Sequence, residues 1–226
     1  MDYKKLIASY PELFSNESAL IRVITDPDEI AKWQEYKFKD LERSGNPPEW
    51  ANIGSVFEDP YVIIIRDLVE FPGGYRNGYI RLYNRAYLEG GAAVVVMLSE
   101  KDGKILLIRH YRHATRMFHW EIPRGFGSSG VDAISQAKME LFEEVNGEVV
   151  EMIDLGVLYQ NTGLDGNPVN VFLARMDAVG EVEYEEGINE LIWVSVPDLE
   201  KMIADSDITD GFTIAAYTKA KLKGLI

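Results

Sequence analysis

Three glutamates in the second half of the chain, Glu140, Glu143 and Glu144, are spaced so that a helix would gather their carboxylates. Residues three and four positions apart lie on the same side of a helix, so the three charges would be close together. Clustered like charges repel one another unless solvent screens them or a cation offsets them. Oxygen ligands of this kind suit Mg²⁺ or Mn²⁺. Two interpretations are therefore open at this point: an acidic, solvent-facing helix, or a site for a divalent cation.

The elements around these glutamates predict the helix that would carry them. A glycine-rich loop, Gly125–Gly130, comes first, and residues suited to a helix start follow it. An apolar stripe with helical spacing then runs along the segment. Asn146 and Gly147 are residue types that accept the left-handed conformation of a helix end. The start-type residues are Ser128, Ser129 and Asp132, and the stripe consists of Ala133, Ile134, Ala137, Leu141 and Val145.

The segment before this loop is unusually basic. It contains four arginines, and guanidinium groups suit bidentate recognition of phosphate. It also contains all three histidines of the chain, but their spacing fits no common zinc pattern. Contact of at least one arginine with a phosphate is therefore the favoured interpretation over a solvated basic loop. The arginines are Arg109, Arg112, Arg116 and Arg124, and the histidines are His110, His113 and His119.

The composition restricts the classes of partner. The chain of 226 residues has a formal net charge of −14, which disfavours general nucleic-acid binding. No apolar run is long enough for a membrane span or a secretory segment, so we expect no membrane partner. Cysteine is absent, which excludes a disulfide framework and a thiol nucleophile and suits a reducing cytoplasm.

The glycine-rich loop also matches a second pattern. Gly125-Phe-Gly-Ser-Ser-Gly130 has the form G-x-G-x-x-G, and Asp154 follows at about the distance of a ribose-binding acid in a dinucleotide fold. The preceding segment contains Pro123 and several polar residues, which makes it a poor buried first strand. The dinucleotide interpretation is therefore disfavoured.

The rest of the chain reads as alternating strands and helices. Residues 1–50 are mainly helical, and Tyr61–Ile65 and Tyr79–Tyr83 read as a hairpin. Further strands and helices follow on both sides of the acidic helix, which predicts an α/β fold. The predicted strands are 92–97, 105–108, 149–159, 169–175 and 191–196, and the later helices begin near Pro197 and within 208–217. Between them lies an acidic run with two further carboxylates, Glu185 and Glu186, which most simply forms a solvated face.

With these residues in place, the stretch Trp120–Gly147 resembles the Nudix box. That box is a Gly, five residues, a Glu, seven residues, and then Arg-Glu-apolar-x-Glu-Glu-x-Gly. Gly125 takes the opening position, and Glu140, Glu143 and Glu144 take the three closing glutamates. The lead-in Trp120–Gly125 and the segment Ile208–Tyr217 are also similar to family segments, and the resemblance extends over about residues 55–226.

The resemblance implies a fold, a domain order and a reaction. The fold would be a mixed sheet sandwiched between helices, with 1–50 as a helical extension, 51–90 as a small sheet that helps to form a homodimer, and 91–226 as the Nudix-like domain. The branch it resembles, the ADP-ribose pyrophosphatases, cleaves the pyrophosphate of a nucleoside diphosphate linked to another group. Mg²⁺ (or Mn²⁺) would be held by Glu140 and Glu144 with the carbonyl of Gly125, and Glu143 would be a ligand or a base.

In the same family interpretation, Arg112, together with Arg109 or Arg124, would hold a phosphate of a small nucleotide-type substrate. Three departures leave an alternative open. Val131 replaces the first Glu of the box and Met139 replaces its Arg. The loop after the next strand has Asn167 where the branch often has a catalytic Glu, and Asp165 is the only acid there, as a substitute or as a turn residue. The alternative is a non-catalytic Nudix-fold protein that binds a nucleotide-like ligand.

Overall fold

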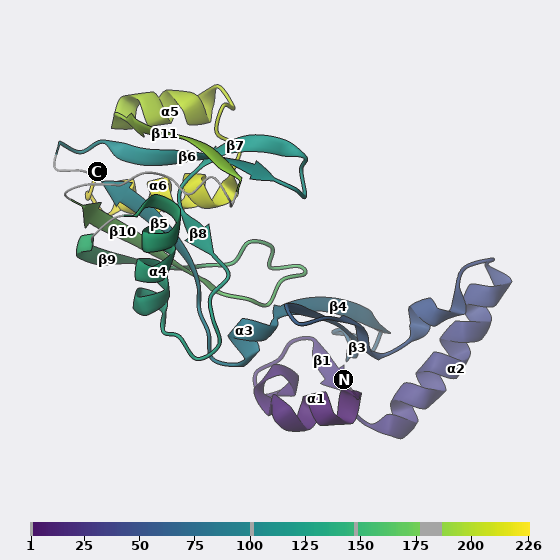
Figure 1. Cartoon of the computed structure of the whole chain (residues 1–226). Helices are drawn as coiled ribbons and strands as arrows, with labels where there is room; N and C mark the ends of the chain where they lie inside the picture. The colour runs from purple at the N-terminus through teal and green to yellow at the C-terminus, as the bar shows by residue number, and fades with distance from the viewer. Residues whose placement is uncertain (1, 100–101, 147–148, 177–186) are drawn as a thin grey trace. The chain divides into compact units, whose positions relative to one another are not determined.

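The computed structural model describes residues 2–99, 102–146, 149–176 and 187–226 (Figure 1). The chain divides into two compact units. One comprises the residues up to Leu88 together with Asn161–Gly166, and the other comprises Glu89–Gln160 and Asn167–Ile226. The first unit thus contains the described residues up to Leu88 and the short loop 161–166, and the division of the N-terminal part at residue 50 stays a prediction.

The N-terminal unit is built on a four-stranded antiparallel sheet with strand β3 at its centre. The predicted hairpin is confirmed: β3 pairs with β4 from Val62↔Asn84 to Glu70↔Arg76, while β1 and β2 share the other edge of β3. Loop 161–166 extends this sheet through hydrogen bonds between Leu82 and the backbone of Leu164 and Gly166. The elements are α1 Tyr3–Ser9, η1 Pro11–Phe14, β1 Arg22–Ile24, α2 Pro27–Arg43, η2 Pro48–Ala51, β2 Gly54–Glu58, β3 Val62–Glu70, β4 Arg76–Asn84 and α3 Arg85–Leu88.

The C-terminal unit contains a seven-stranded mixed sheet. Its main path runs β11-β6-β5-β10-β9, with β7 paired to β6 and β8 to β5. Strands β5 and β10 are parallel, and the other pairs are antiparallel. The elements are β5 Ala93–Ser99, β6 Ile105–Arg112, β7 Met117–Glu121, β8 Arg124–Gly125, α4 Ala133–Val145, β9 Val149–Leu158, β10 Val169–Met176, β11 Ile188–Val194, α5 Val196–Ala204 and α6 Gly211–Leu222.

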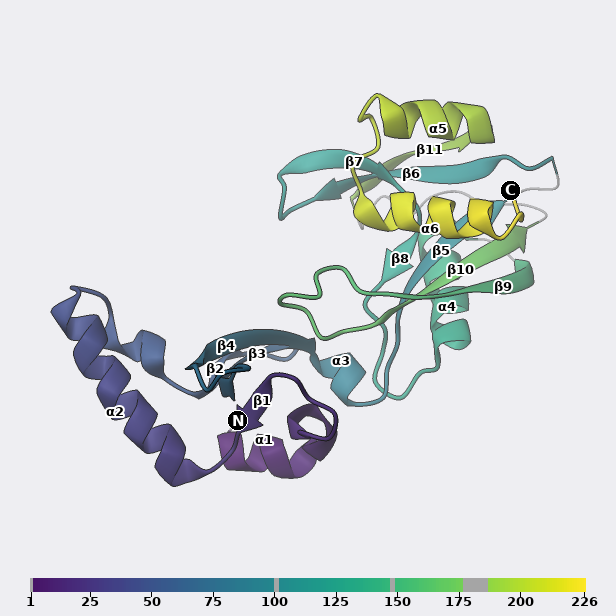
Figure 2. The same ribbon diagram turned by 180° about the vertical axis from the view of Figure 1, so that it is seen from behind.

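Both faces of this sheet are covered, as the alternation along β5 requires. Ala93, Val95 and Met97 pack into a core with α5 and α6, while Val94, Val96 and Leu98 pack into a second core with α4. Helix α4 lies in front of the sheet in Figure 1, and α6 lies in front of it in Figure 2. The predicted fold class, a mixed sheet between helices, is therefore confirmed.

The loop that matches G-x-G-x-x-G does not belong to a dinucleotide fold. The strand before it, β8, has two residues and runs antiparallel to β5, and the strand after α4, β9, runs antiparallel to β10. A dinucleotide site needs a parallel βαβ unit. Most of the basic segment from Arg109 to Arg124 is strand and not loop. Arg109–Arg112 are the last residues of β6, and Met117–Glu121 form β7.

Candidate active site

Helix α4 is held at both ends by residues of the expected types. The Asp132 carboxylate accepts hydrogen bonds from the N–H groups of Ile134 and Ser135, and Asn146 ends the helix at φ 45°. One predicted member of the apolar stripe is misplaced: Ile134 is 49% exposed. In the first turn it is Ala133 that packs against the core, and Ala137, Leu141 and Val145 continue the stripe.

The three glutamates of α4 do not have equivalent surroundings. Glu144 is 2% exposed, Glu140 is half-buried and Glu143 is exposed. Each helical residue is rotated about 100° from the one before. Glu144 therefore turns toward the sheet on which Leu141 and Val145 pack, and Glu143 turns toward solvent.

Gly125 lies directly against the Glu140 carboxylate. A Cβ built on Gly125 would be 1.8 Å from Oε1 of Glu140 and 1.9 Å from its Cδ. No other residue type fits without moving the carboxylate. Strand β8 fixes this approach, because Gly125 pairs with Val94 at the centre of the sheet. The backbone at Gly125 and the Glu140 carboxylate are thus neighbours, while their role as members of a cation site stays a prediction.

Glu144 is buried beside the same residues. Its Oε2 accepts a hydrogen bond of 3.2 Å from the N–H of Arg124. Burial, followed by the charge of Glu140, raises the pKa of Glu144 to about 8, although the nearby Arg112 acts in the opposite direction. A second positive charge beside the two carboxylates would relieve this unfavourable burial.

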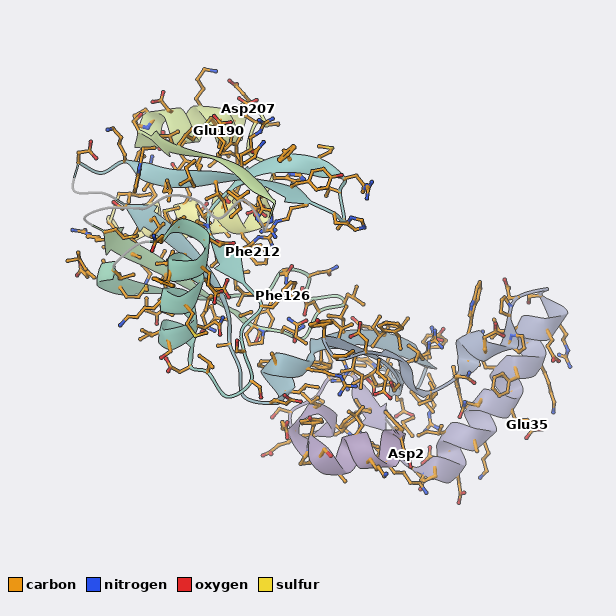
Figure 3. All side chains as sticks on the ribbon, viewed as in Figure 1. Asp2, Glu35, Phe126, Glu190, Asp207 and Phe212 are labelled. Atoms are coloured by element: carbon orange, nitrogen blue, oxygen red, sulfur yellow. The ribbon has the colours of Figure 1, made fainter. Side chains whose placement is uncertain are left out.

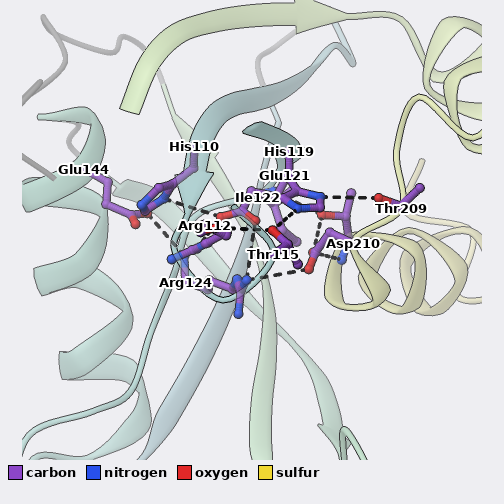
Figure 4. A network of polar contacts seen from close by, with 11 residues as sticks. His110, Arg112, Thr115, His119, Glu121, Ile122, Arg124, Glu144, Thr209 and Asp210 are labelled. Atoms are coloured by element: carbon purple, nitrogen blue, oxygen red, sulfur yellow. Dashed lines mark hydrogen bonds and ion pairs between the residues drawn. The ribbon is translucent and has the colours of Figure 1, made fainter. Parts of the chain in front are cut away.

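A buried carboxylate, Glu121, holds the basic residues of the site (Figure 4). It is 0% exposed and forms an ion pair with Arg112. Its other oxygen lies 3.4 Å from Arg124, and His110 Nδ1 lies 3.4 Å from Oε1. Within the described part of the chain, the Nε atoms of Arg112 and Arg124 are buried and have no hydrogen-bond partner. Glu121 therefore does not accept from every donor of the two guanidinium groups.

Arg109 does not join this group. Side chains alternate along a strand, so Arg109 lies on the opposite face of β6 from His110 and Arg112. Its guanidinium lies over the rings of Phe118 and Trp120, at 5.0 and 5.9 Å from their centres, and 3.6 Å from the Glu190 carboxylate of β11. Figure 3 labels Glu190 and, near the site, Phe212.

The start of α6 completes the surroundings of Arg124. Asp210 caps this helix by accepting from Thr213 and lies 3.7 Å from the Arg124 guanidinium, which covers the ring of Phe212. Thr213 Oγ1 in turn accepts from the N–H of Ile122, and His119 connects Thr115 to Thr209 (Figure 4). A cleft of about 360 Å³ opens here, lined by Arg124, Leu158, Tyr159, Gln160, Asp210, Gly211, Phe212 and Ala215.

The remaining candidate carboxylates are not among the described residues of the C-terminal unit. Asp165 belongs to the N-terminal unit, where it forms an isolated bridge with Leu82. Glu185 and Glu186 lie outside the described residues.

Comparison with protein families gives the context of this site. The family profile described as NUDIX domain matches residues 89–211, which is more than half of the chain and includes every residue of the acidic and basic groups above. The chain belongs to the Nudix family.

Two relatives of this chain share one name. ADP-ribose pyrophosphatase of Bacillus subtilis (strain 168) is 24% identical over 172 residues, covering 74% of this chain and 89% of its own. ADP-ribose pyrophosphatase of Mycobacterium tuberculosis (strain ATCC 25618 / H37Rv) is 27% identical over 154 residues, covering 66% of this chain and 72% of its own. The predicted similarity to this Nudix branch is confirmed.

A solved structure supports the fold. The crystal structure of an ADP compounds hydrolase aligns with a TM-score of 0.61 at 19% identity, over 77% of this chain and 95% of that one.

Two features, a cluster of metal-ligating side chains and a membrane-spanning helix, were not found among the residues that the structure describes. No group of three or more His, Cys, Asp or Glu side chains is arranged to hold a metal ion. No helix in the same ranges has the length and apolar character needed to cross a membrane.

Proposed function

We propose that this Nudix protein is a metal-dependent hydrolase that cleaves the pyrophosphate of a nucleoside diphosphate linked to another group, of the ADP-ribose or nucleotide-sugar type. One observation carries the proposal. The acidic pair Glu140 and Glu144 lies against β8, and the same short strand supplies Arg124 to the basic group around Glu121. The proposed site for a cation and the proposed site for phosphate would thus adjoin each other within one unit.

The residues present fit a hard divalent cation that retains several waters. Glu140 and Glu144 would hold Mg²⁺ or Mn²⁺ together with the carbonyl of Gly125, and the buried Glu144 beside a second carboxylate is a donor set that a cation stabilises. When bound, such a cation would offset charge on the pyrophosphate and make water more acidic.

The chain's own residues would bind and orient the substrate. Arg112 and Arg124, held by Glu121, would each donate to a phosphate oxygen. The cleft between Arg124 and the start of α6 would receive the group beyond the phosphates, with Phe212 as an apolar surface and Asp210 as an acceptor for hydroxyls. Glu143 is exposed on the same helix, and we assign to it the proton from the attacking water. Asp165, the other acid predicted for this role, belongs to the N-terminal unit, and its part in catalysis stays a prediction.

The apolar residues at positions 131 and 139 favour the alternative function, a Nudix-fold protein that binds a nucleotide-like ligand without cleaving it. Val131 and Met139 place no charge near the carboxylates, and Met139 is 42% exposed. A panel led by ADP-ribose, with nucleotide-sugars and dinucleotides, separates the two functions. We expect Mg²⁺- or Mn²⁺-dependent release of a nucleoside monophosphate, detected by chromatography. Thermal stabilisation by these ligands with no product under any metal condition would instead support the binding protein. The homodimer and a cytoplasmic location stay predictions, and light scattering tests the first.

A further inference from the structure

Gln136 is a buried amide whose two ends are both used. The side chain is 3% exposed. Its Oε1 accepts a hydrogen bond of 2.9 Å from the N–H of Ser128 in the glycine-rich loop, and its Nε2 donates one of 2.6 Å to Oε1 of Glu140. The loop, the first half of α4 and the half-buried carboxylate are therefore connected through one side chain.

This arrangement fixes the direction of the contact with Glu140. A buried amide that lacks its hydrogen bonds carries a large desolvation cost. The Ser128 N–H can only donate, so it selects the oxygen of Gln136 and leaves the NH₂ group to point along α4. Four positions further on, one helical turn away, that NH₂ group meets Glu140.

Glu140 is thus held from two sides. The backbone at Gly125 limits where its carboxylate can lie, and Gln136 donates to the same oxygen that comes closest to Gly125. Val131 and Met139 carry no polar group that could do this. We propose that Gln136 is a positioning residue that sets the Glu140 carboxylate for a divalent cation. This proposal rests on the proposed function, which assigns a divalent cation to Glu140.

The test is Mn²⁺ binding without substrate, measured from the free Mn²⁺ signal in electron paramagnetic resonance. Gln136→Met keeps the side-chain length and removes both hydrogen bonds. Loss of a group that orients a metal ligand typically weakens metal binding by about 10- to 100-fold, and we expect a weakening in this range. Gln136→Asn, which is one methylene too short to connect both partners, should behave in the same way.

Asp132→Ala is the matched control. It removes the cap of the same helix and so lowers stability. The Asp132 side chain bonds to Ile134 and Ser135, and the backbone hydrogen bond from the Gln136 N–H to the Asp132 carbonyl is kept in the alanine variant. We expect its Mn²⁺ affinity to stay within about twofold of the unmodified chain. Equal affinities for the unmodified chain and a folded Gln136→Met variant would overturn the proposal, as would an equal weakening by Asp132→Ala.

A second comparison separates positioning of Glu140 from anchoring of the loop through Ser128. In a Glu140→Ala background, Gln136→Met should weaken Mn²⁺ binding no further, because the carboxylate it positions is gone. The same fold-loss in both backgrounds would overturn the proposal in favour of loop anchoring. Absence of Mn²⁺ binding by the unmodified chain would overturn both this proposal and the metal-dependent function. Intact, Gln136-dependent Mn²⁺ binding without hydrolysis of any substrate would overturn only the proposed function.

Discussion

Substitution of Gly125 by alanine probes the contact on which the acidic site depends. The added Cβ would be 1.8 Å from Oε1 of Glu140 and 2.3 Å from Oε2, and contacts of a Cβ below 3.0 Å are essentially not seen in proteins. Since the end of a flexible side chain can move more easily than strand β8, we expect the carboxylate to shift by more than about 1 Å.

The size of this shift sets the expected loss of activity. A misplacement of about 1 Å in a catalytic arrangement can lower the rate by about 100-fold, so Gly125→Ala should lower kcat by a factor of this order. Gly125 does not have a left-handed backbone conformation, so alanine adds no backbone strain. The displaced carboxylate would, however, lose its hydrogen bond from the buried Gln136 amide, so the free energy of unfolding should fall by about 1–3 kcal/mol.

The assay is the metal-dependent rate of nucleoside monophosphate release, with urea unfolding as the measure of stability. A double-mutant cycle with Glu140→Ala then tests the cause. If Gly125→Ala acts by displacing Glu140, the double variant should be no slower than Glu140→Ala alone. A wild-type rate for Gly125→Ala would refute the proposed contact, and additive losses in the cycle would show that the substitution acts elsewhere.

Three further predictions concern charge and helix termination. Without metal, the free energy of unfolding should fall as the pH rises from about 4.5 to about 8, because burial raises the pKa of Glu144 to about 8 and the folded state keeps a proton that the unfolded state releases. The fall in unfolding free energy is at most about 5 kcal/mol. Urea unfolding over this pH range should show it for the unmodified chain but not for Glu144→Gln. The same pH dependence in both proteins would contradict the burial of a protonated Glu144. In steady-state kinetics, Arg112→Ala should raise KM by about tenfold or more. Arg109→Ala, on the other face of β6, should change KM less than about twofold. Similar changes in KM for both variants would contradict the assignment of the two arginines to opposite faces. Because Asn146 has φ 45°, Asn146→Val should lower the free energy of unfolding by about 1–2 kcal/mol, whereas Asn146→Gly should not. Calorimetry measures both variants, and equal stabilities of the two would show that the helix ends here for another reason.

The features that the sequence predicted correctly depend on local chemistry. The caps of α4 are decided by single residues, Asp132 at one end and Asn146 at the other. The buried strand β5 is a continuous apolar run, and its alternation serves two cores at once. Such signals need no knowledge of distant partners.

The features that the sequence did not predict depend on contacts between distant segments. The sequence around Gln136 predicts only a helix, and it does not show that Gln136 accepts a hydrogen bond from the Ser128 N–H. Likewise, Asp210 can be predicted as a helix cap, but not as the residue whose carboxylate lies 3.7 Å from Arg124. Glu121 had a local signal, since it is a lone acid in a largely apolar stretch between two arginines, but its partners come from β6 and β8. The separation of Arg109 from Arg112 would have followed from strand alternation, had β6 been predicted to extend to Arg112.

The central claim is that the carboxylates of α4 support metal-dependent cleavage of a pyrophosphate. It is tested most directly by AMP release from ADP-ribose, with Mg²⁺ or Mn²⁺ and with a chelator, by the unmodified chain and by Glu144→Gln. We expect release by the unmodified chain only with metal, and a loss of about 100-fold or more in the folded variant. Equal release by both proteins, or release in the presence of the chelator, would contradict the assignment of the site.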